Sequence, residues 1–302
     1  MNLNPHLPIV YHPNYSFNFD PKHRFVMSKF AYLYEHVKSL GLINSNLEQP
    51  ILGTPEPLEL VHCDNYIYDL WHNRLDEKAM RRIGLPWSEQ LMARTFTAPL
   101  GTLQTARLAL KHGIACHLAG GTHHAHTDFG SGYCMVNDLA FTSETLIKSG
   151  EVTNILIFDL DVHQGDGTAA MLAHQPYAYT CSIHCEKNFP FRKSASNLDI
   201  GLAANVADSE YLGVVDDTLS YLLNTLNPDL VLYDAGVDVW QEDGLGKLDI
   251  SWKGIEQRDH LVLKRCLERN VPVATVIGGG YDKDHRRLAA PHGIVVEQAA
   301  QF

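Results

Sequence analysis

Continuous apolar runs alternate with amphipathic segments along most of this 302-residue chain. A run in which almost every position is apolar is typical of a strand that is buried on both faces of a sheet. By this pattern, strands are predicted at residues 7–12, 114–121, 154–161, 177–184, 228–236 and 271–280.

Apolar residues recur at helical spacing in the segments between these strands. In residues 23–41 this spacing places Met27, Phe30 and Val37 on one face. Further helices are predicted at residues 98–113, 209–227 and 252–270. Strands that alternate with helices predict an α/β fold with a central, mostly parallel sheet and helices on both faces. No repeat or linker composition divides the chain, so we expect a single domain over residues 1–302.

Polar and glycine-rich residues follow five of the predicted strands at their C-terminal ends. These groups lie at residues 120–124, 159–163, 182–184, 234–238 and 278–281. The carboxyl ends of parallel strands meet at one edge of a sheet, and ligands of open α/β sheets bind outside that edge. We therefore expect one functional site, built from all five groups.

The polar group after residue 158 has the composition of a metal site. Asp161 and His163 are two positions apart on a chain that leaves a strand, so their side chains point the same way. Asp238, after another strand, can add a third ligand. Two carboxylates, an imidazole and an open position suit a catalytic divalent ion. The competing interpretation is that these polar residues only cap turns and helices, with Asp166 at a helix start.

A tandem histidine pair adds acid–base chemistry to the same edge. His123 and His124 follow two glycines, and Asp159 and Asp166 are carboxylates that the metal does not need. Two His–Asp pairs beside a metal ion fit metal-assisted hydrolysis. Tyr281, after three glycines, can donate to a developing oxyanion, although it can also be an ordinary loop tyrosine.

The composition and the net charge argue against several classes of protein. The net charge of −11 argues against nucleic-acid binding over a broad basic surface. No apolar run approaches the roughly 18 residues that cross a bilayer, and the N-terminus lacks the pattern of a secretory signal, so we expect no membrane association. The six cysteines contain no CxxC pair, which in a chain of this size indicates reduced thiols in a cytoplasmic protein.

Four motifs together resemble the zinc-dependent histone deacetylase family, which has the arginase/deacetylase fold. They occur in the family's order, at residues 119–140, 155–168, 234–251 and 276–281. Residues 254–262, "GIEQRDHLV", are most similar to the class IV branch and its bacterial relatives. The resemblance implies a hydrolase that removes acetyl or longer acyl groups from the ε-amine of lysine in a protein or peptide.

The resemblance also implies two metal sites. One Zn²⁺ per chain would be bound by Asp161, His163 and Asp238. A structural K⁺ would lie close to the zinc. Its ligands would be the side chains of Asp159 and Ser182 and the backbone carbonyls of Asp161, His163 and Ile183.

The family's catalytic roles can be carried over residue by residue. His124, paired with Asp166, would be the general base and acid, and His123, paired with Asp159, would orient groups and stabilise charge. Tyr281 would donate a hydrogen bond to the tetrahedral intermediate.

The family's substrate tunnel has counterparts in this sequence as well. Tyr133 and Phe189 would form its aromatic walls, and the Gly132 carbonyl would accept the N–H of the substrate amide. Leu245 would stand at the tunnel mouth.

Three other functions remain open at this point. An acetylpolyamine deacetylase, acting on a small acylated amine, would need a carboxylate at the tunnel mouth. Leu245 is apolar, but Glu242 and Asp243 are close in sequence. A non-catalytic acyl-lysine-binding module is disfavoured because every predicted metal ligand and Tyr281 are present. An arginase-like di-manganese hydrolase would need further carboxylate ligands. The oligomeric state is not predicted.

Overall fold

The structure, a computed structural model, describes residues 3–302. In this part of the chain eight strands form one sheet, in the order β2-β1-β3-β8-β7-β4-β5-β6, and every neighbouring pair is parallel. The strands are β1 (Ile9–Val10), β2 (Leu47–Glu48), β3 (Ile114–His117), β4 (Ile155–Asp159), β5 (Ala178–Cys185), β6 (Leu198–Leu202), β7 (Leu230–Asp234) and β8 (Val273–Val276). Every residue of β3, β4, β7 and β8 is buried, as their continuous apolar runs predict.

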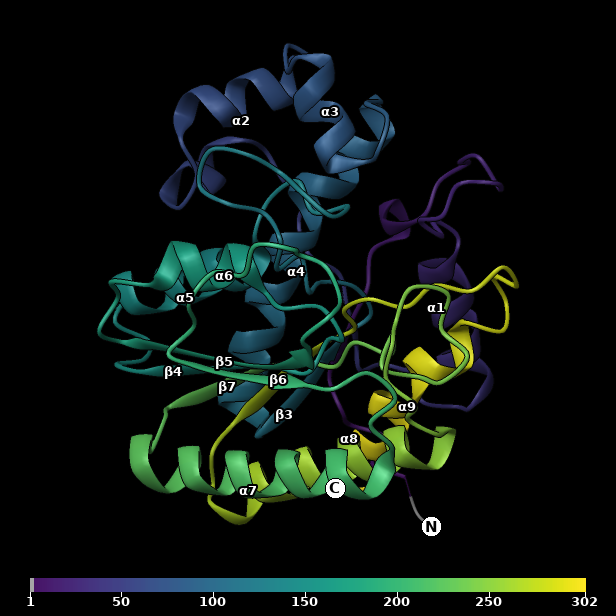
Figure 1. Cartoon of the computed structure of the whole chain (residues 1–302), viewed down its shortest axis with the longest axis vertical. Coiled ribbons are helices and arrows are strands. Elements are labelled where there is room, and N and C mark those ends of the chain that lie inside the picture. The colour runs from purple at the N-terminus through teal and green to yellow at the C-terminus, as the bar shows by residue number, and fades with distance from the viewer. Residues whose placement is uncertain (1–2) are drawn as a thin grey trace.

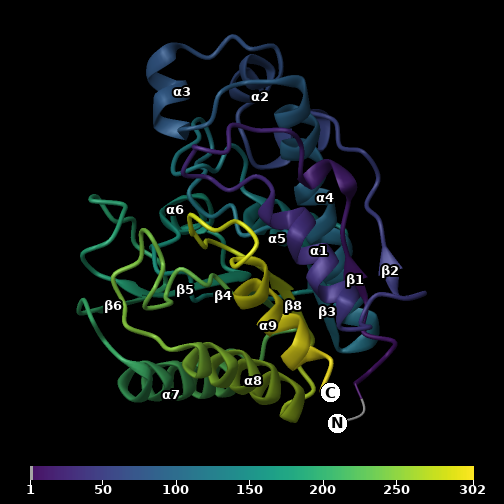
Figure 2. The ribbon, with the colours of Figure 1, turned by 90° about the vertical axis from the view of Figure 1, so that its right-hand side faces the viewer.

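Helices cover both faces of this sheet. They are α1 (Lys29–Ser39), α2 (Asp64–Trp71), α3 (Glu77–Ile83), α4 (Glu89–His112), α5 (Asp138–Lys148), α6 (Asp166–Leu172), α7 (Asp208–Leu226), α8 (Trp252–Glu268) and α9 (Ala289–Ala299). Helices α5 and α6 lie on one face and α7 and α8 on the opposite face (Figure 1). Helices α1 and α9 pack against each other near β3 (Figure 2). The predicted parallel α/β architecture is therefore confirmed.

Several predicted boundaries were wrong, and each has a local cause. The strands predicted to reach residues 121 and 280 end at His117 and Val276 because Gly120, Gly121 and Gly278 adopt positive φ angles of 85°, 82° and 57°. These left-handed conformations turn the chain out of the sheet. The freed segments form the loops of the expected site.

Helix α4 begins at Glu89, well before the predicted start at residue 98. The Ser88 side chain accepts a hydrogen bond from the Leu91 N–H and caps the helix. Pro99 lies inside the helix. Most side chains of this part of α4 are buried, so packing outweighs the cost of an internal proline.

The register of the strands aligns the polar residues at their C-terminal ends. Asp159 at the end of β4 is paired with Ser182 of β5 on one side and with Asp234 of β7 on the other. Asp234 is in turn paired with Val276 of β8. The loops that carry the remaining polar residues therefore leave the sheet side by side.

The six cysteines are free thiols, as their spacing predicts. Five of them are buried, and Cys63 is exposed. Across residues 3–302, no helix combines the length and the apolar character needed to cross a bilayer.

Candidate active site

Asp161, His163 and Asp238 form a compact, buried cluster at the carboxyl edge of the sheet. His163 Nδ1 lies 3.0 Å from Asp161 Oδ1 and 3.1 Å from Asp238 Oδ2. The three ligand atoms all lie within 4.8 Å of one another. Bonds of about 2.0 Å around a tetrahedral ion separate its ligands by roughly 3.3 Å, so these donors can share one ion after small adjustments. The donor set and its spacing fit a divalent metal.

Backbone N–H groups orient both carboxylates of this cluster. Asp161 accepts from the N–H groups of His163 (2.9 Å) and Gly279 (2.6 Å), and Asp238 accepts from Val162 (2.8 Å). Burial by itself lowers the pKa of His163, but its hydrogen bonds to the two carboxylates raise that pKa to about 10. The negative charge of the two carboxylates favours a positive charge on the imidazole, and the same attraction favours a metal cation among these ligands.

Two buried His–Asp pairs stand beside the cluster. His123 Nδ1 lies 2.7 Å from Asp159 Oδ2, and His124 Nδ1 lies 2.7 Å from Asp166 Oδ1. The two Nε2 atoms approach to 3.2 Å, which requires that one of them carries a proton. Burial opposes a charge on His123, but Asp159 raises its pKa well above the usual value. Burial and the charge of His123 lower the pKa of His124 to about 4, so His124 is the neutral imidazole that can accept a proton.

Asp166 does not cap a helix. It is the first residue of α6, and Gly165 occupies the capping position without a side-chain bond. The Asp166 carboxylate instead contacts His124 and, at 3.1 Å, His126 Nε2. The capping interpretation is therefore wrong for this residue. Sequence patterns did not identify His126 as part of the site. Its position two residues after His124 is the feature that could have indicated it.

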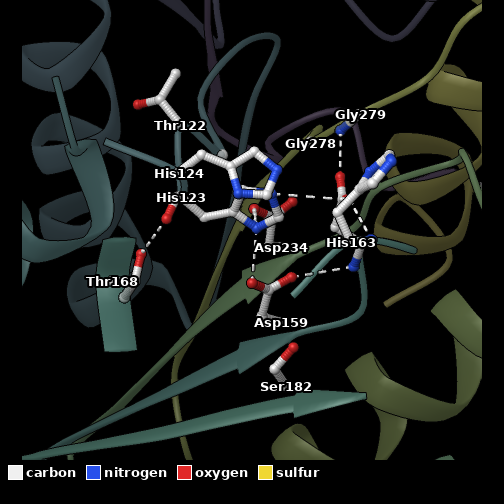
Figure 3. A network of polar contacts seen from close by, with 12 residues as sticks. Thr122, His123, His124, Asp159, His163, Thr168, Ser182, Asp234, Gly278 and Gly279 are labelled. Atoms are coloured by element: carbon white, nitrogen blue, oxygen red, sulfur yellow. Dashed lines mark hydrogen bonds and ion pairs between the residues drawn. The ribbon is translucent and has the colours of Figure 1, made fainter. Parts of the chain in front are cut away.

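A further carboxyl, Asp234, lies behind His123. It is fully buried, and neither of its oxygens has a hydrogen-bond partner in the described chain. One oxygen is 3.9 Å from His123 Nδ1 (Figure 3). Burial and the nearby Asp159 raise the pKa of Asp234 well above the usual value, so the side chain is a neutral acid. His123, Asp159 and Asp234 also have the composition of a metal site, but the direct 2.7 Å hydrogen bond between His123 and Asp159 is that of a His–carboxylate pair.

The residues predicted from the family's potassium site are close together in the structure. Asp159 and Ser182 are register partners on adjacent strands, and Ser182 lies near Asp159 in Figure 3. The Asp161 N–H donates to Asp159 Oδ1 at 3.0 Å. Ile183 follows Ser182 in β5 and is fully buried.

A cavity opens over the metal cluster and the histidines. Its lining residues come from the segment before α1, from α1 and α4, and from the loops at the sheet edge: Phe25, Lys29, Phe30, Arg94, Gly120, Gly121, Thr122, His123, His124, Gly132, Tyr133, Cys134, Asp161, His163, Gly278, Gly279 and Tyr281. Sequence patterns did not identify Lys29 and Arg94. Both are buried cations, and Lys29 Nζ lies 3.3 Å from the Gly278 carbonyl.

Tyr281 is held at this cavity by its backbone. Its N–H donates to Asp243 Oδ2 at 2.6 Å, and its carbonyl accepts from the Gly244 N–H at 2.9 Å. Burial and the carboxylates of Asp238 and Asp161 raise the pKa of Tyr281 well above the usual value. The phenol therefore remains protonated and can act as a hydrogen-bond donor.

The residues predicted to form the substrate tunnel differ in their position relative to the cavity. Tyr133 lines the cavity, and its ring centroid lies 5.9 Å from that of Tyr281. Phe189 stands nearly perpendicular to His124, with ring centroids 4.9 Å apart. At Gly132 an added Cβ would lie 2.6 Å from His124 Cδ2, so only glycine allows this close approach. Neither Phe189 nor Leu245 is among the lining residues.

A family model matches nearly the whole chain. The histone deacetylase domain covers residues 23–295. The chain belongs to the histone deacetylase family. Membership of this metal-dependent family makes the chain a hydrolase of the deacetylase type and confirms the relationship predicted from the four motifs.

Relatives of this histone deacetylase-family protein match along most of their lengths. An uncharacterized protein of Picosynechococcus sp. is 47% identical over 289 residues, which are 95% of this chain and 96% of the relative. Histone deacetylase 2 of Arabidopsis thaliana is 27% identical, over 93% of this chain and 76% of its own. The acetoin utilization protein AcuC of Staphylococcus aureus is also 27% identical, over 88% of this chain and 74% of its own.

Solved structures share the deacetylase fold. A homolog of histone deacetylases crystallised with SAHA aligns with a TM-score of 0.80 at 23% identity, over 97% of this chain and 84% of its own. The homolog from Aquifex aeolicus aligns over the same shares with a TM-score of 0.79 at 23% identity. These alignments confirm the predicted arginase/deacetylase fold.

Proposed function

We propose that this protein is a zinc-dependent lysine deacylase, working as one catalytic domain, that removes acetyl or longer acyl groups from lysine ε-amines. The observation that carries the proposal is the meeting of three features in one cavity. Asp161 and His163 of the metal-ligand cluster, His123 and His124 of the two His–Asp pairs, and Tyr281 all line this cavity. Their partners Asp238, Asp159 and Asp166 lie within hydrogen-bond distance behind them. Amide hydrolysis needs an electrophile, a proton carrier and an oxyanion donor, and these features can supply all three.

One Zn²⁺ would be held by Asp161, His163 and Asp238 and, when bound, supplies polarisation of the acyl carbonyl and of the attacking water. The chain's own groups then carry the protons. His124 accepts the proton of the water at Nε2 while Asp166 holds its Nδ1–H, and it later protonates the leaving amine.

The other groups stabilise charge during the same reaction. His123, held by Asp159, keeps a positive charge beside His124. Tyr281 donates to the oxygen that becomes negative in the tetrahedral intermediate. A K⁺ ion bound by the Asp159 and Ser182 side chains and by the carbonyls of Asp161, His163 and Ile183 would offset the buried negative charge next to these pairs.

The substrate would enter along Tyr133 and Phe189. The Gly132 carbonyl would accept the N–H of the scissile amide, and Leu245 would contact the substrate outside the cavity. The crystal structure of a protein with this fold in complex with SAHA supports the proposal that this fold binds a small ligand.

The carboxylates near Leu245 favour acyl-lysine over an acetylated polyamine. Asp243 accepts the N–H groups of Tyr281, Leu245 and Gly246. The Glu242 carboxylate lies 2.7 Å from the Arg287 guanidinium. Both carboxylates therefore have partners within the protein, whereas a polyamine substrate needs a free carboxylate for its second amine.

A substrate panel tests the proposed function directly. The zinc-loaded protein is assayed on matched lysine peptides that carry acetyl, butyryl, octanoyl or myristoyl groups, and on acetylated polyamines. We expect the highest kcat/KM on an acyl-lysine peptide. A higher kcat/KM on acetylpolyamines would replace the proposal by the small-amine alternative, and no turnover of any compound would refute it.

Tyr281→Phe is expected to lower kcat by about 10²–10³-fold with little change in substrate affinity. The change keeps the ring and removes only the donor, so it weakens an interaction that exists mainly in the transition state. Single-turnover kinetics on an acetyl-lysine peptide measure the chemical step. Tyr68→Phe, on the exposed surface of α2, is the matched control. A normal single-turnover rate for Tyr281→Phe would show that the phenol does not take part in the chemistry.

A further inference from the structure

Arg258 is a fully buried arginine that the chemistry above does not use. It lies in α8, on the face opposite α5 and α6, and its side chain is 0% exposed. Burying a guanidinium costs free energy unless its N–H groups are satisfied. The positions of its hydrogen-bond partners therefore indicate what the residue does.

The guanidinium joins α8 to the loop that follows β7. Its Nη1 donates to the Gly236 carbonyl at 2.6 Å, and its Nη2 donates to the Ala235 carbonyl at 3.2 Å. Its Nε donates to Asp259 Oδ1 at 2.8 Å. The same carboxylate oxygen accepts the Tyr233 hydroxyl at 2.6 Å. The positive charge is thus compensated inside the protein, and the two terminal nitrogens, Nη1 and Nη2, donate to the loop.

The loop held in this way carries a proposed metal ligand. Residues 235–238 run from the end of β7 to Asp238, and all of them are buried. Within the described chain, the carbonyls of Ala235 and Gly236 have no hydrogen-bond donor other than Arg258. Buried carbonyls rarely remain unpaired. Loss of the guanidinium would leave both carbonyls without a donor and the loop held only by its N–H groups, with Ala235 bonded to Val276 and Val237 bonded to Gly279.

The same backbone also touches the second carboxylate ligand. An added Cβ at Gly236 would lie 2.6 Å from Asp161 Oδ2 and 2.8 Å from Asp161 Cα. A shift of the loop would therefore change the separation of the two proposed ligands, Asp161 and Asp238.

We propose that Arg258 is a positioning residue that holds the 235–238 loop, and through it Asp238, in the geometry that binds the metal ion. The inference rests on the proposed zinc site. A planar guanidinium reaches two adjacent carbonyls and Asp259 at once, which a single ammonium group cannot reproduce. Partners beyond the ligands themselves typically change metal affinity by roughly 10–100-fold when they are removed.

The test compares Zn²⁺ dissociation constants of the full chain, measured by competition with a chromophoric chelator. Arg258→Met is expected to weaken Zn²⁺ binding by roughly 10–100-fold, and Arg258→Lys to restore only part of the loss. Arg258→Met combined with Asp259→Asn removes both buried charges and leaves an acceptor for the Tyr233 hydroxyl. This double variant avoids a lone buried charge and keeps the measurement possible if Arg258→Met does not fold.

Two controls separate positioning from general stability. Arg265→Met removes an arginine of the same helix that pairs with Asp216 at 2.7 Å, away from the loop, and should leave Zn²⁺ affinity unchanged. Tyr233→Phe removes a buried hydrogen bond to Asp259 but no contact to the loop carbonyls. It should lower the thermal unfolding temperature while Zn²⁺ affinity stays near that of the wild type.

The outcomes distinguish this inference from the proposed function. Wild-type protein that binds no Zn²⁺ would refute the zinc site itself and, with it, the positioning role. Tight binding by the wild type and equally tight binding by the folded double variant would refute the positioning role alone. Weakened binding in the Arg258 variants, with unchanged binding in both controls, supports it.

Discussion

Removal of the divalent ion from the Asp161–His163–Asp238 site is expected to abolish hydrolysis of an acetyl-lysine peptide. An amide carbonyl that no metal ion polarises is a poor electrophile. A bound metal ion typically lowers the pKa of its water to about 7, and this activation is lost with the ion. Activity should return when Zn²⁺ is added in a one-to-one ratio. The measurement pairs metal content with initial rates before and after dialysis against a chelator.

A ligand variant provides the matched test of this first prediction. Asp238→Asn keeps the size of the side chain and removes the charge, so it should lose both bound Zn²⁺ and activity. Asp216→Asn changes an aspartate that pairs with Arg265 on the surface and should keep both. Full activity in protein shown to be free of metal would contradict the proposed mechanism.

His124→Ala is expected to lower kcat by about 10²–10⁴-fold, the usual contribution of general acid–base catalysis, while KM changes little. Burial and the neighbouring His123 lower the pKa of His124 to about 4, so its imidazole is neutral near neutral pH and does not already carry the proton that a general base must accept. Asp166 fixes the ring by accepting its Nδ1–H. Pre-steady-state kinetics on the zinc-loaded variant measure the loss in the chemical step.

The second partner of Asp166 provides the control for this variant. His126→Ala removes the 3.1 Å contact with Asp166 but leaves His124 and its 2.7 Å pairing in place. Its effect on kcat should be far smaller. An intact kcat in His124→Ala would identify a different base, and His123→Ala would then be the variant to measure.

Much of the sheet could be predicted from local patterns. The apolar run before Asp159 became β4 because a central parallel strand must be apolar on both faces. The short edge strands β2 and β6 were not predicted, because their residues are only partly buried and carry no continuous apolar pattern. Helix α9 was missed as well, since its residues are apolar on nearly all sides and show little helical periodicity.

The residue types and their order along the chain indicated the chemistry of the site and its place at one edge of the sheet. Asp161, His163 and Asp238 all follow the C-terminal ends of parallel strands. Tertiary structure alone decided which distant groups serve that edge. Arg258 lies in α8, a different element from the loop that carries Asp238. The packing of α8 against the sheet brings its guanidinium to the residues just before Asp238. Lys29 reaches the cavity from α1 in a similar way. Spacing along a chain encodes periodicity and burial, whereas hydrogen-bond partners depend on how separate helices and strands pack, and no local pattern records that.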